Sequence, residues 1–158
     1  MVSKSARGAE APAPSLTPRP GARRPGVLVV EADWEARMQL DQQLSAAGFD
    51  VAAAPSRAVA VDAYLRHGGP IDVVVAGAGG TELPATALLA WLKSHFPGLP
   101  CCFLAGPEEW VAAAALRSAG GLVLTRPLSY LRLAAVLRRL VAESPSDEGD
   151  EQTGPSAA

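Results

Sequence analysis

The sequence contains few of the residues from which disulfide frameworks and metal centres are built. Two cysteines and two histidines occur among its 158 residues, and Cys101 and Cys102 are adjacent within an apolar run. Adjacent cysteines in such a run are expected to pack as small hydrophobic residues rather than form a disulfide or hold a metal. His67 and His95 have no cysteine or aspartate at ligand spacing, so neither indicates a metal centre.

Neither sign of charge predominates, and the sequence has no long apolar run. The formal net charge is -2, from 14 basic and 16 acidic residues, which gives no broad electrostatic footprint for nucleic acid or an anionic membrane. No apolar run approaches the roughly 20 residues that span a bilayer, and no hydrophobic block follows the N-terminal basic residues to make a signal peptide. We therefore expect a cytoplasmic protein whose partners are neither nucleic acid nor membrane.

Both ends of the chain have the composition of disordered segments. Residues 1–25 are rich in Ala, Pro, Ser and Gly with mostly positive charges, whereas residues 143–158 are acidic and rich in small residues. Segments of this kind bury too little apolar area to offset the chain entropy lost on folding. The sequence predicts one domain over residues 26–142, between a basic arm and an acidic tail.

Within this domain, five short apolar runs alternate with five stretches of helical periodicity. The predicted strands are Val27–Val30, Phe49–Ala53, Ile71–Ala76, Cys101–Leu104 and Leu122–Thr125. The stretches between them place apolar residues on one face, for example Ala112, Ala115, Leu116 and Ala119 after the fourth strand. This order is typical of an α/β fold, a flavodoxin-like (βα)5 doubly wound parallel sheet, in which ligand sites gather at the carboxyl ends of the strands.

Five segments in order resemble the receiver domain of two-component response regulators. They are VLVVEAD (27–33), AAGFDVAAAPS (46–56), GGPIDVVVAGAGG (68–80), LKSHFPGLPCCFLAG (92–106) and RSAGGLVLTRPLS (117–129). The last segment holds the step Arg126-Pro127-Leu128, which is similar to the family's Lys-Pro-hydrophobic ending. The resemblance covers the whole predicted domain and implies a cis peptide bond before Pro127.

In that family an acidic pair after the first strand binds Mg²⁺, a hard cation that prefers carboxylate oxygens. Glu31 matches one member of the pair, but the second position is Ala32, which has no oxygen to offer. Asp33 is the alternative partner for Glu31 in a weaker cation site. We expect no cofactor, and Mg²⁺ binding is disfavoured.

The resemblance places the other phosphorylation-site positions at four residues that differ from the family's pattern. Gly77 stands where the acceptor aspartate is expected, and Ala105 stands where a Ser or Thr hydroxyl binds the phosphoryl oxygens. Val123 replaces the aromatic switch residue, and Arg126 replaces the lysine. We therefore expect a pseudo-receiver that is not an enzyme and has no catalytic residues.

Glu31 and Arg126 retain opposite charges at two of these positions. If the guanidinium reaches the carboxylate, the pair imitates the lysine–carboxylate contact of the family and holds the strand ends in one conformation. The sequence thus predicts an internal ion pair in place of a metal or phosphoryl site.

Two alternatives to a phosphorylation-independent module remain. One is an atypical response regulator that accepts a phosphoryl group on another residue. The other is a small-ligand or nucleotide sensor at Gly77–Gly80, where glycines after a strand resemble a phosphate loop. The third glycine of a dinucleotide fingerprint would fall at Glu82, where a carboxylate would face an anion.

Receivers usually bind partners through the face made by the fourth helix, the fifth strand and the fifth helix. Four residues of this region lie outside the apolar stripes, and an arginine lies near them: Trp110, Tyr130, Leu131, Val136 and Arg132. Large aromatic residues and arginine dominate protein interfaces. We expect this face to bind a signalling protein of a bacterial two-component or phosphorelay pathway, with a homodimer as the alternative.

Overall fold

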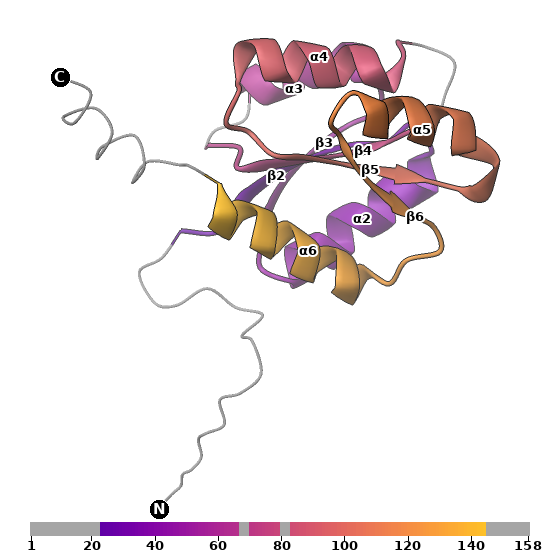
Figure 1. The fold of residues 1–158 in the computed structure, drawn as a ribbon. Helices are drawn as coiled ribbons and strands as arrows, with labels where there is room; N and C mark the ends of the chain where they lie inside the picture. Colours follow the sequence, from indigo (N-terminus) through magenta and orange to yellow (C-terminus); the bar gives the residue numbers. More distant parts are fainter. Residues whose placement is uncertain (1–22, 67–69, 80–82, 145–158) are drawn as a thin grey trace, which may run out of the picture.

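The computed structural model describes residues 23–66, 70–79 and 83–144, in which five strands alternate with five α-helices (Figure 1). In chain order the elements are β2 (Gly26–Val30), α2 (Trp34–Ala46), β3 (Asp50–Ala54), α3 (Arg57–Arg66), β4 (Val73–Gly77), α4 (Ala85–His95), β5 (Cys101–Ala105), the 3-10 turn η1 (Pro107–Glu109), α5 (Trp110–Ser118), β6 (Leu122–Thr125) and α6 (Tyr130–Glu143).

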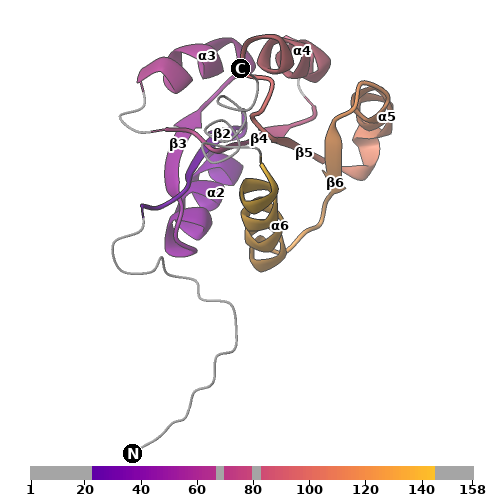
Figure 2. The ribbon, with the colours of Figure 1, turned by 60° about the vertical axis from the view of Figure 1, so that its left-hand side comes forward.

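The strands form one parallel sheet in the order β3-β2-β4-β5-β6. Counted along the chain this is second, first, third, fourth and fifth, the order of the flavodoxin-like doubly wound fold. Helices α3, α4 and α5 cover one face of the sheet, and α2 and α6 cover the other (Figures 1 and 2). The predicted fold class is confirmed.

The central strand β4 shows why both faces need helices. Val73 and Val75 pack with the residues of α2 and α6, whereas Val74 and Ala76 pack with those of α3, α4 and α5, and all four are buried. Successive side chains of a strand point to opposite faces, so a continuous apolar run must be covered on both. The predicted start of this strand at Ile71 is two residues early, because pairing with β2 begins at Val73.

Caps and turns fix the helix boundaries. Asp33, Ser56 and Ser129 each accept a backbone N–H in the first turn of the following helix, at 2.8, 3.2 and 3.0 Å. Gly48 and Gly120 follow α2 and α5 with φ of 102° and 89°, a left-handed conformation that favours glycine. The Arg126–Pro127 peptide bond is cis, the isomer that the resemblance implies.

Two of the four residues in the apolar face predicted for α5, Ala112 and Leu116, pack against the core. Leu116 is buried as expected, but Ala115 and Ala119 are exposed and the second buried residue is Ala113. The sequence from Ala112 to Ala115 is four alanines, so hydrophobicity does not distinguish one side of the helix from another there. The phase is instead set by η1, after which α5 begins at Trp110.

The predicted domain boundaries move slightly outward. Helix α6 extends to Glu143, one residue into the predicted acidic tail, and Arg24 of the predicted basic arm donates to the Ser45 carbonyl at 2.6 Å. The prediction of disorder falls mainly on residues 1–22 and 145–158, which lie outside the described residues. The side chains of Val61 and Leu65 on α3 are not described either. No helix in the described part of the chain is long and apolar enough to cross a membrane.

Asp72 attaches the N-terminal residues to the domain. Its carboxylate accepts two hydrogen bonds from Arg23 and one from the Gly26 N–H, all at 2.8 Å. Burial tends to raise the pKa of Asp72, but these hydrogen bonds and the Arg23 charge outweigh it and hold the pKa below its usual value. The contacts therefore contribute stability above pH 3.8, the usual value, and this stability is lost as the pH falls through the lower folded-state pKa.

We predict that Asp72→Asn lowers the free energy of unfolding by about 1–2 kcal/mol at neutral pH, since hydrogen bonds to a charged group are replaced by neutral ones and Arg23 is half exposed. Urea unfolding of both proteins from pH 7 to pH 2.5 measures the difference, which should shrink below about pH 4. A difference that stays constant over this range would contradict the role given to the ionised carboxylate.

Candidate functional site

The carboxyl ends of the strands bring the predicted site residues to one edge of the sheet. Parallel pairing places Val30 beside both Ala54 and Ala76, so β2, β3 and β4 end at the same level. The residues that follow or end these strands, together with those after β5 and β6, surround a cavity of about 390 Å³. It is lined by Val30, Glu31, Ala32, Asp33, Pro55, Ser56, Arg57, Gly77, Gly79, Glu109 and Arg126.

An ion pair crosses this cavity. Arg126 Nη2 lies 2.9 Å from Glu31 Oε1, and the two side chains are 37% and 12% exposed. The second carboxylate oxygen of Glu31 accepts the backbone N–H of Asp33 at 3.0 Å. The predicted ion pair is therefore present, and it connects the end of β2 with the end of β6 across the two strands between them.

Glu31 also fills the space beside Gly77, the position at which the resemblance places the phosphoryl acceptor. A Cβ atom added at Gly77 would lie 3.0 Å from Glu31 Oε1, closer than ordinary van der Waals contact. The carboxylate at this edge of the sheet is thus supplied by the residue after β2, and its charge is paired with an arginine. No carboxylate is attached to β4 here.

Arg57 is the functional-site residue that the sequence analysis missed. Its side chain is buried, although it is the first residue of α3. The guanidinium donates to the carbonyls of Leu83 and Gly77 at 2.6 Å each, and to the carbonyl of Gly79. Arg57 therefore holds the backbone on both sides of the connection between β4 and α4 by charge-assisted hydrogen bonds.

The other carboxylates of the cavity are occupied by backbone contacts. Asp33 caps α2, and Glu109 Oε1 accepts the Gly106 N–H at 2.8 Å. The Glu109 carboxylate also lies against Gly79, where an added Cβ would overlap it. Among the described residues, no three His, Cys, Asp or Glu side chains are grouped so as to hold a metal ion.

Two further positions named by the resemblance, Ala105 and Val123, are buried and apolar, whereas Ala32 is exposed. Ala105 and Val123 are 0% and 8% exposed, in the core between the sheet and α3, α4 and α5. Cys101 and Cys102 are free, and burial raises the pKa of both thiols to about 12. They pack in the core as protonated hydrophobic side chains, as expected.

Several predictions fall on residues that the structure does not describe. Gly80 and Glu82, which belong to the alternative phosphate loop, lie outside the described residues, as does His67. His95 ends α4 and stacks on Trp91 at 4.6 Å between ring centroids.

The residues of the predicted partner face lie on two helices, Trp110 on α5 and the others on α6. Tyr130 donates its hydroxyl hydrogen bond to Gln39 of α2 at 3.1 Å, and Leu131 lines a small hollow between α2 and α6. Trp110 is 70% exposed at the start of α5, which covers the opposite face of the sheet from α2 and α6. Arg132 is exposed and Val136 is half-buried on α6.

A second exposed tryptophan was not identified from the sequence. Trp34 is the first residue of α2 and is 64% exposed. It is four residues beyond the end of β2, and Trp110 is five residues beyond the end of β5, so both tryptophans start helices at the edge of the sheet that holds the cavity. Its position directly after the Asp33 cap is the signal that would have placed it there.

Comparison with solved structures assigns the fold. A response regulator receiver domain protein from Clostridium thermocellum is 18% identical with a TM-score of 0.68, over 75% of this chain and 94% of that one. A receiver protein from Sinorhizobium medicae is 22% identical, with a TM-score of 0.65, over 76% and 96%. The receiver domain of an HD domain-containing protein from Pseudomonas fluorescens is 23% identical with a TM-score of 0.68, over 79% and 100%.

No protein-family model matches the sequence. No curated protein matches it either. The chain thus has a receiver-domain fold at sequence identities that establish the fold alone.

Proposed function

We propose that this protein is a receiver-like module of two-component or phosphorelay signalling that acts by binding other proteins and does not depend on phosphorylation. The observation that carries the proposal is the Glu31–Arg126 ion pair beside Gly77. It occupies the space in which a phosphorylated aspartate and its metal would have to sit. The fold supports a signalling module, and the site supports one without phosphoryl chemistry.

Three positions that the resemblance assigns to phosphoryl chemistry lack the required group. Gly77 provides no nucleophile, Ala32 no metal ligand and Ala105 no hydroxyl. Arg126 is paired with Glu31, so a phosphoryl group in this cavity would also face the Glu31 carboxylate. The same groups argue against a nucleotide at the connection after β4, because the Glu31 and Glu109 carboxylates stand where phosphate oxygens would approach.

The test is incubation of the full chain with acetyl phosphate and Mg²⁺, followed by intact-protein mass spectrometry. We expect no mass increase corresponding to a phosphoryl group, under conditions in which a conventional receiver domain is modified. An adduct that maps to a carboxylate and is removed by hydroxylamine would overturn phosphorylation independence and favour the atypical phospho-accepting regulator.

The exposed tryptophans indicate where a protein partner binds. Trp34 and Trp110 stand at the edge of the sheet that holds the cavity, on helices that cover opposite faces. Tryptophan contributes more binding free energy to protein interfaces than most residue types. Folding does not require two exposed tryptophans at one edge of the sheet. We propose that a signalling protein of the same pathway binds this edge, and that the ion pair fixes the conformation it recognises.

We predict that replacing Trp34 and Trp110 together by alanine reduces partner capture from cells at least tenfold while changing the free energy of unfolding by no more than about 0.5–1 kcal/mol. Affinity capture with quantitative mass spectrometry measures the first quantity and urea unfolding the second. Met38→Ala, at another exposed apolar position on α2, is the matched control. Equal recovery of the same partners by the variant and the wild type would remove this edge from consideration.

Light scattering of the purified proteins distinguishes a homodimer from a complex with another protein. A dimer of the wild type that becomes a monomer in the double variant would mean that the partner is a second copy of this chain. A monomer in both cases leaves the edge available for another protein.

A further inference from the structure

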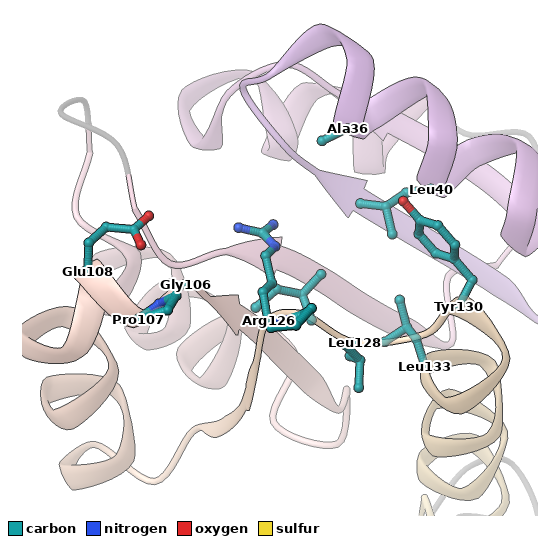
Figure 3. A pocket seen from close by; sticks show the side chains of 11 residues that line it. Ala36, Leu40, Gly106, Pro107, Glu108, Arg126, Leu128, Tyr130 and Leu133 are labelled. Atoms are coloured by element: carbon teal, nitrogen blue, oxygen red, sulfur yellow. The ribbon is translucent and has the colours of Figure 1, made fainter.

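A second cavity, of about 460 Å³, lies on the side of Arg126 that faces α2 and α6 (Figure 3). It is bounded by α2, by the connection from β5 to α5 and by the start of α6. Its size is in the range of roughly 300–1,000 Å³ that is typical of small-molecule sites. None of the interactions proposed above uses it, apart from the shared arginine.

The floor of this cavity is apolar. Leu40, Leu104 and Leu133 line it and are 4%, 4% and 1% exposed, so their positions are fixed by the core beneath. Leu128 and the ring of Tyr130 complete the wall on the α6 side (Figure 3). An apolar group entering here gains the hydrophobic contribution of burial without opening the core.

Two opposite charges lie at the mouth of the cavity. Figure 3 shows the Arg126 guanidinium and the Glu108 carboxylate pointing to the same side, with a gap between them. Glu108 belongs to η1 and turns back over Gly106, where an added Cβ would lie 2.8 Å from both carboxylate oxygens. Among the described residues, the ion pair found for Arg126 is with Glu31, not with Glu108.

We propose that this cavity binds a small zwitterion with an apolar side chain, of the class of the hydrophobic α-amino acids. A ligand of one charge would gain from one of the two groups and be repelled by the other. A zwitterion gains from both, with its carboxylate toward Arg126 and its ammonium toward Glu108. Arginine has five N–H donors, so it can bind a second carboxylate while Nη2 keeps its contact with Glu31.

The ligand would therefore sit against the ion pair that holds β2 and β6. This inference goes beyond the proposed function and stands or falls separately, because it requires neither the presence nor the absence of a phosphoryl group. The bound ligand would be a chemical signal to which a module without a phosphorylation site can respond.

The experiment is a titration of the full ¹⁵N-labelled chain at pH 7, followed by amide chemical shifts. L-leucine and L-phenylalanine are the probes, and we expect at least one to give saturable shifts around Leu128 and Tyr130 with a Kd in the millimolar range or tighter. The analogues that lack one feature are 4-methylpentanoate, 3-methylbutylamine and glycine. Each should bind about tenfold more weakly or worse, because each loses one charge-assisted or apolar contact.

Variants place the binding in this cavity. Glu108→Gln, at an exposed position, should weaken binding of the amino acid about tenfold and leave binding of 4-methylpentanoate no weaker. Ala36→Leu keeps a good helix former on α2 and fills the cavity, so binding should be lost, whereas the same change at exposed Ala135 on α6 should leave it unchanged. No saturable shift with either probe, binding retained in Ala36→Leu, or 4-methylpentanoate binding as tightly as leucine would overturn the proposal.

Discussion

Replacing Arg57 with alanine is expected to lower the free energy of unfolding by about 3–5 kcal/mol. The side chain is 4% exposed, and its guanidinium donates to the carbonyls of Gly77, Gly79 and Leu83. Truncation leaves these carbonyls without their donor and opens a void at the start of α3. The effect is large because one side chain donates to backbone carbonyls on both sides of the connection between β4 and α4.

Urea unfolding of the wild type and the variant gives the magnitude. Arg66→Ala is the matched control, since Arg66 lies on the same helix, is exposed and pairs with Asp62 four residues before it; it should cost no more than about 0.5 kcal/mol. Arg57→Lys keeps the charge with fewer donors and should fall between the two. A loss below about 1 kcal/mol for the alanine variant would mean that the connection is held by other contacts.

The fold could be predicted because every strand is marked by an apolar run and every helix by a boundary residue. The β4 segment is continuously apolar and had to be central, as the strand order shows. Gly48 and Gly120 follow the ends of α2 and α5, and Ser129 precedes and caps α6. Local signals of this kind depend on a few neighbouring residues and survive into the folded structure.

The ion pair of the candidate site could be predicted in the same way. Glu31 and Arg126 are each the first residue after a strand, and parallel strands end at one edge, so their opposite charges were expected to meet. Their separation of 95 residues along the chain is irrelevant once the topology is known. The same argument identified Gly77 but gave no indication that Glu31 would lie against it.

The remaining features depend on tertiary contacts that no local pattern records. Arg57 follows a capping serine, where an arginine is ordinarily solvent-exposed, and its burial arises from the carbonyls of a loop about 20 residues later. Tyr130 and Leu131 were assigned to a face with Trp110 because they lie outside the apolar stripe of α6. The helical pattern does not record that α6 packs against α2 at this point, where Tyr130 bonds Gln39 and Leu131 lines a hollow.

Contacts of two arginines within the chain hold the carboxyl edge of the sheet. Arg126 joins the end of β2 to the end of β6 through Glu31, and Arg57 joins the start of α3 to the connection after β4. Both guanidinium groups bind oxygen atoms of the chain itself. An acceptor restored at Gly77 would therefore disturb contacts that this edge already makes.

Gly77→Asp, the substitution that would restore an acceptor, is expected to destabilise the protein by about 2–4 kcal/mol at pH 7 and to give no phosphoryl adduct. The new Cβ would lie 3.0 Å from Glu31 Oε1, so the Glu31 side chain must leave Arg126 or share the space with a second carboxylate. Two carboxylates in contact raise each other's pKa, so the penalty is full at neutral pH and shrinks as acid protonates one of them.

A double-mutant cycle with Glu31→Ala isolates this conflict. Glu31→Ala alone should cost about 1–2 kcal/mol, because it removes the partner of Arg126, which is partly exposed. In the double variant the clash and the repulsion are gone and Arg126 can pair with the new aspartate. Gly77→Asp should then cost at least about 1 kcal/mol less than it does in the wild-type background. Urea unfolding at pH 7 and pH 5 measures the cycle. Additive losses of the free energy of unfolding would show that Glu31 does not oppose an aspartate at the acceptor position.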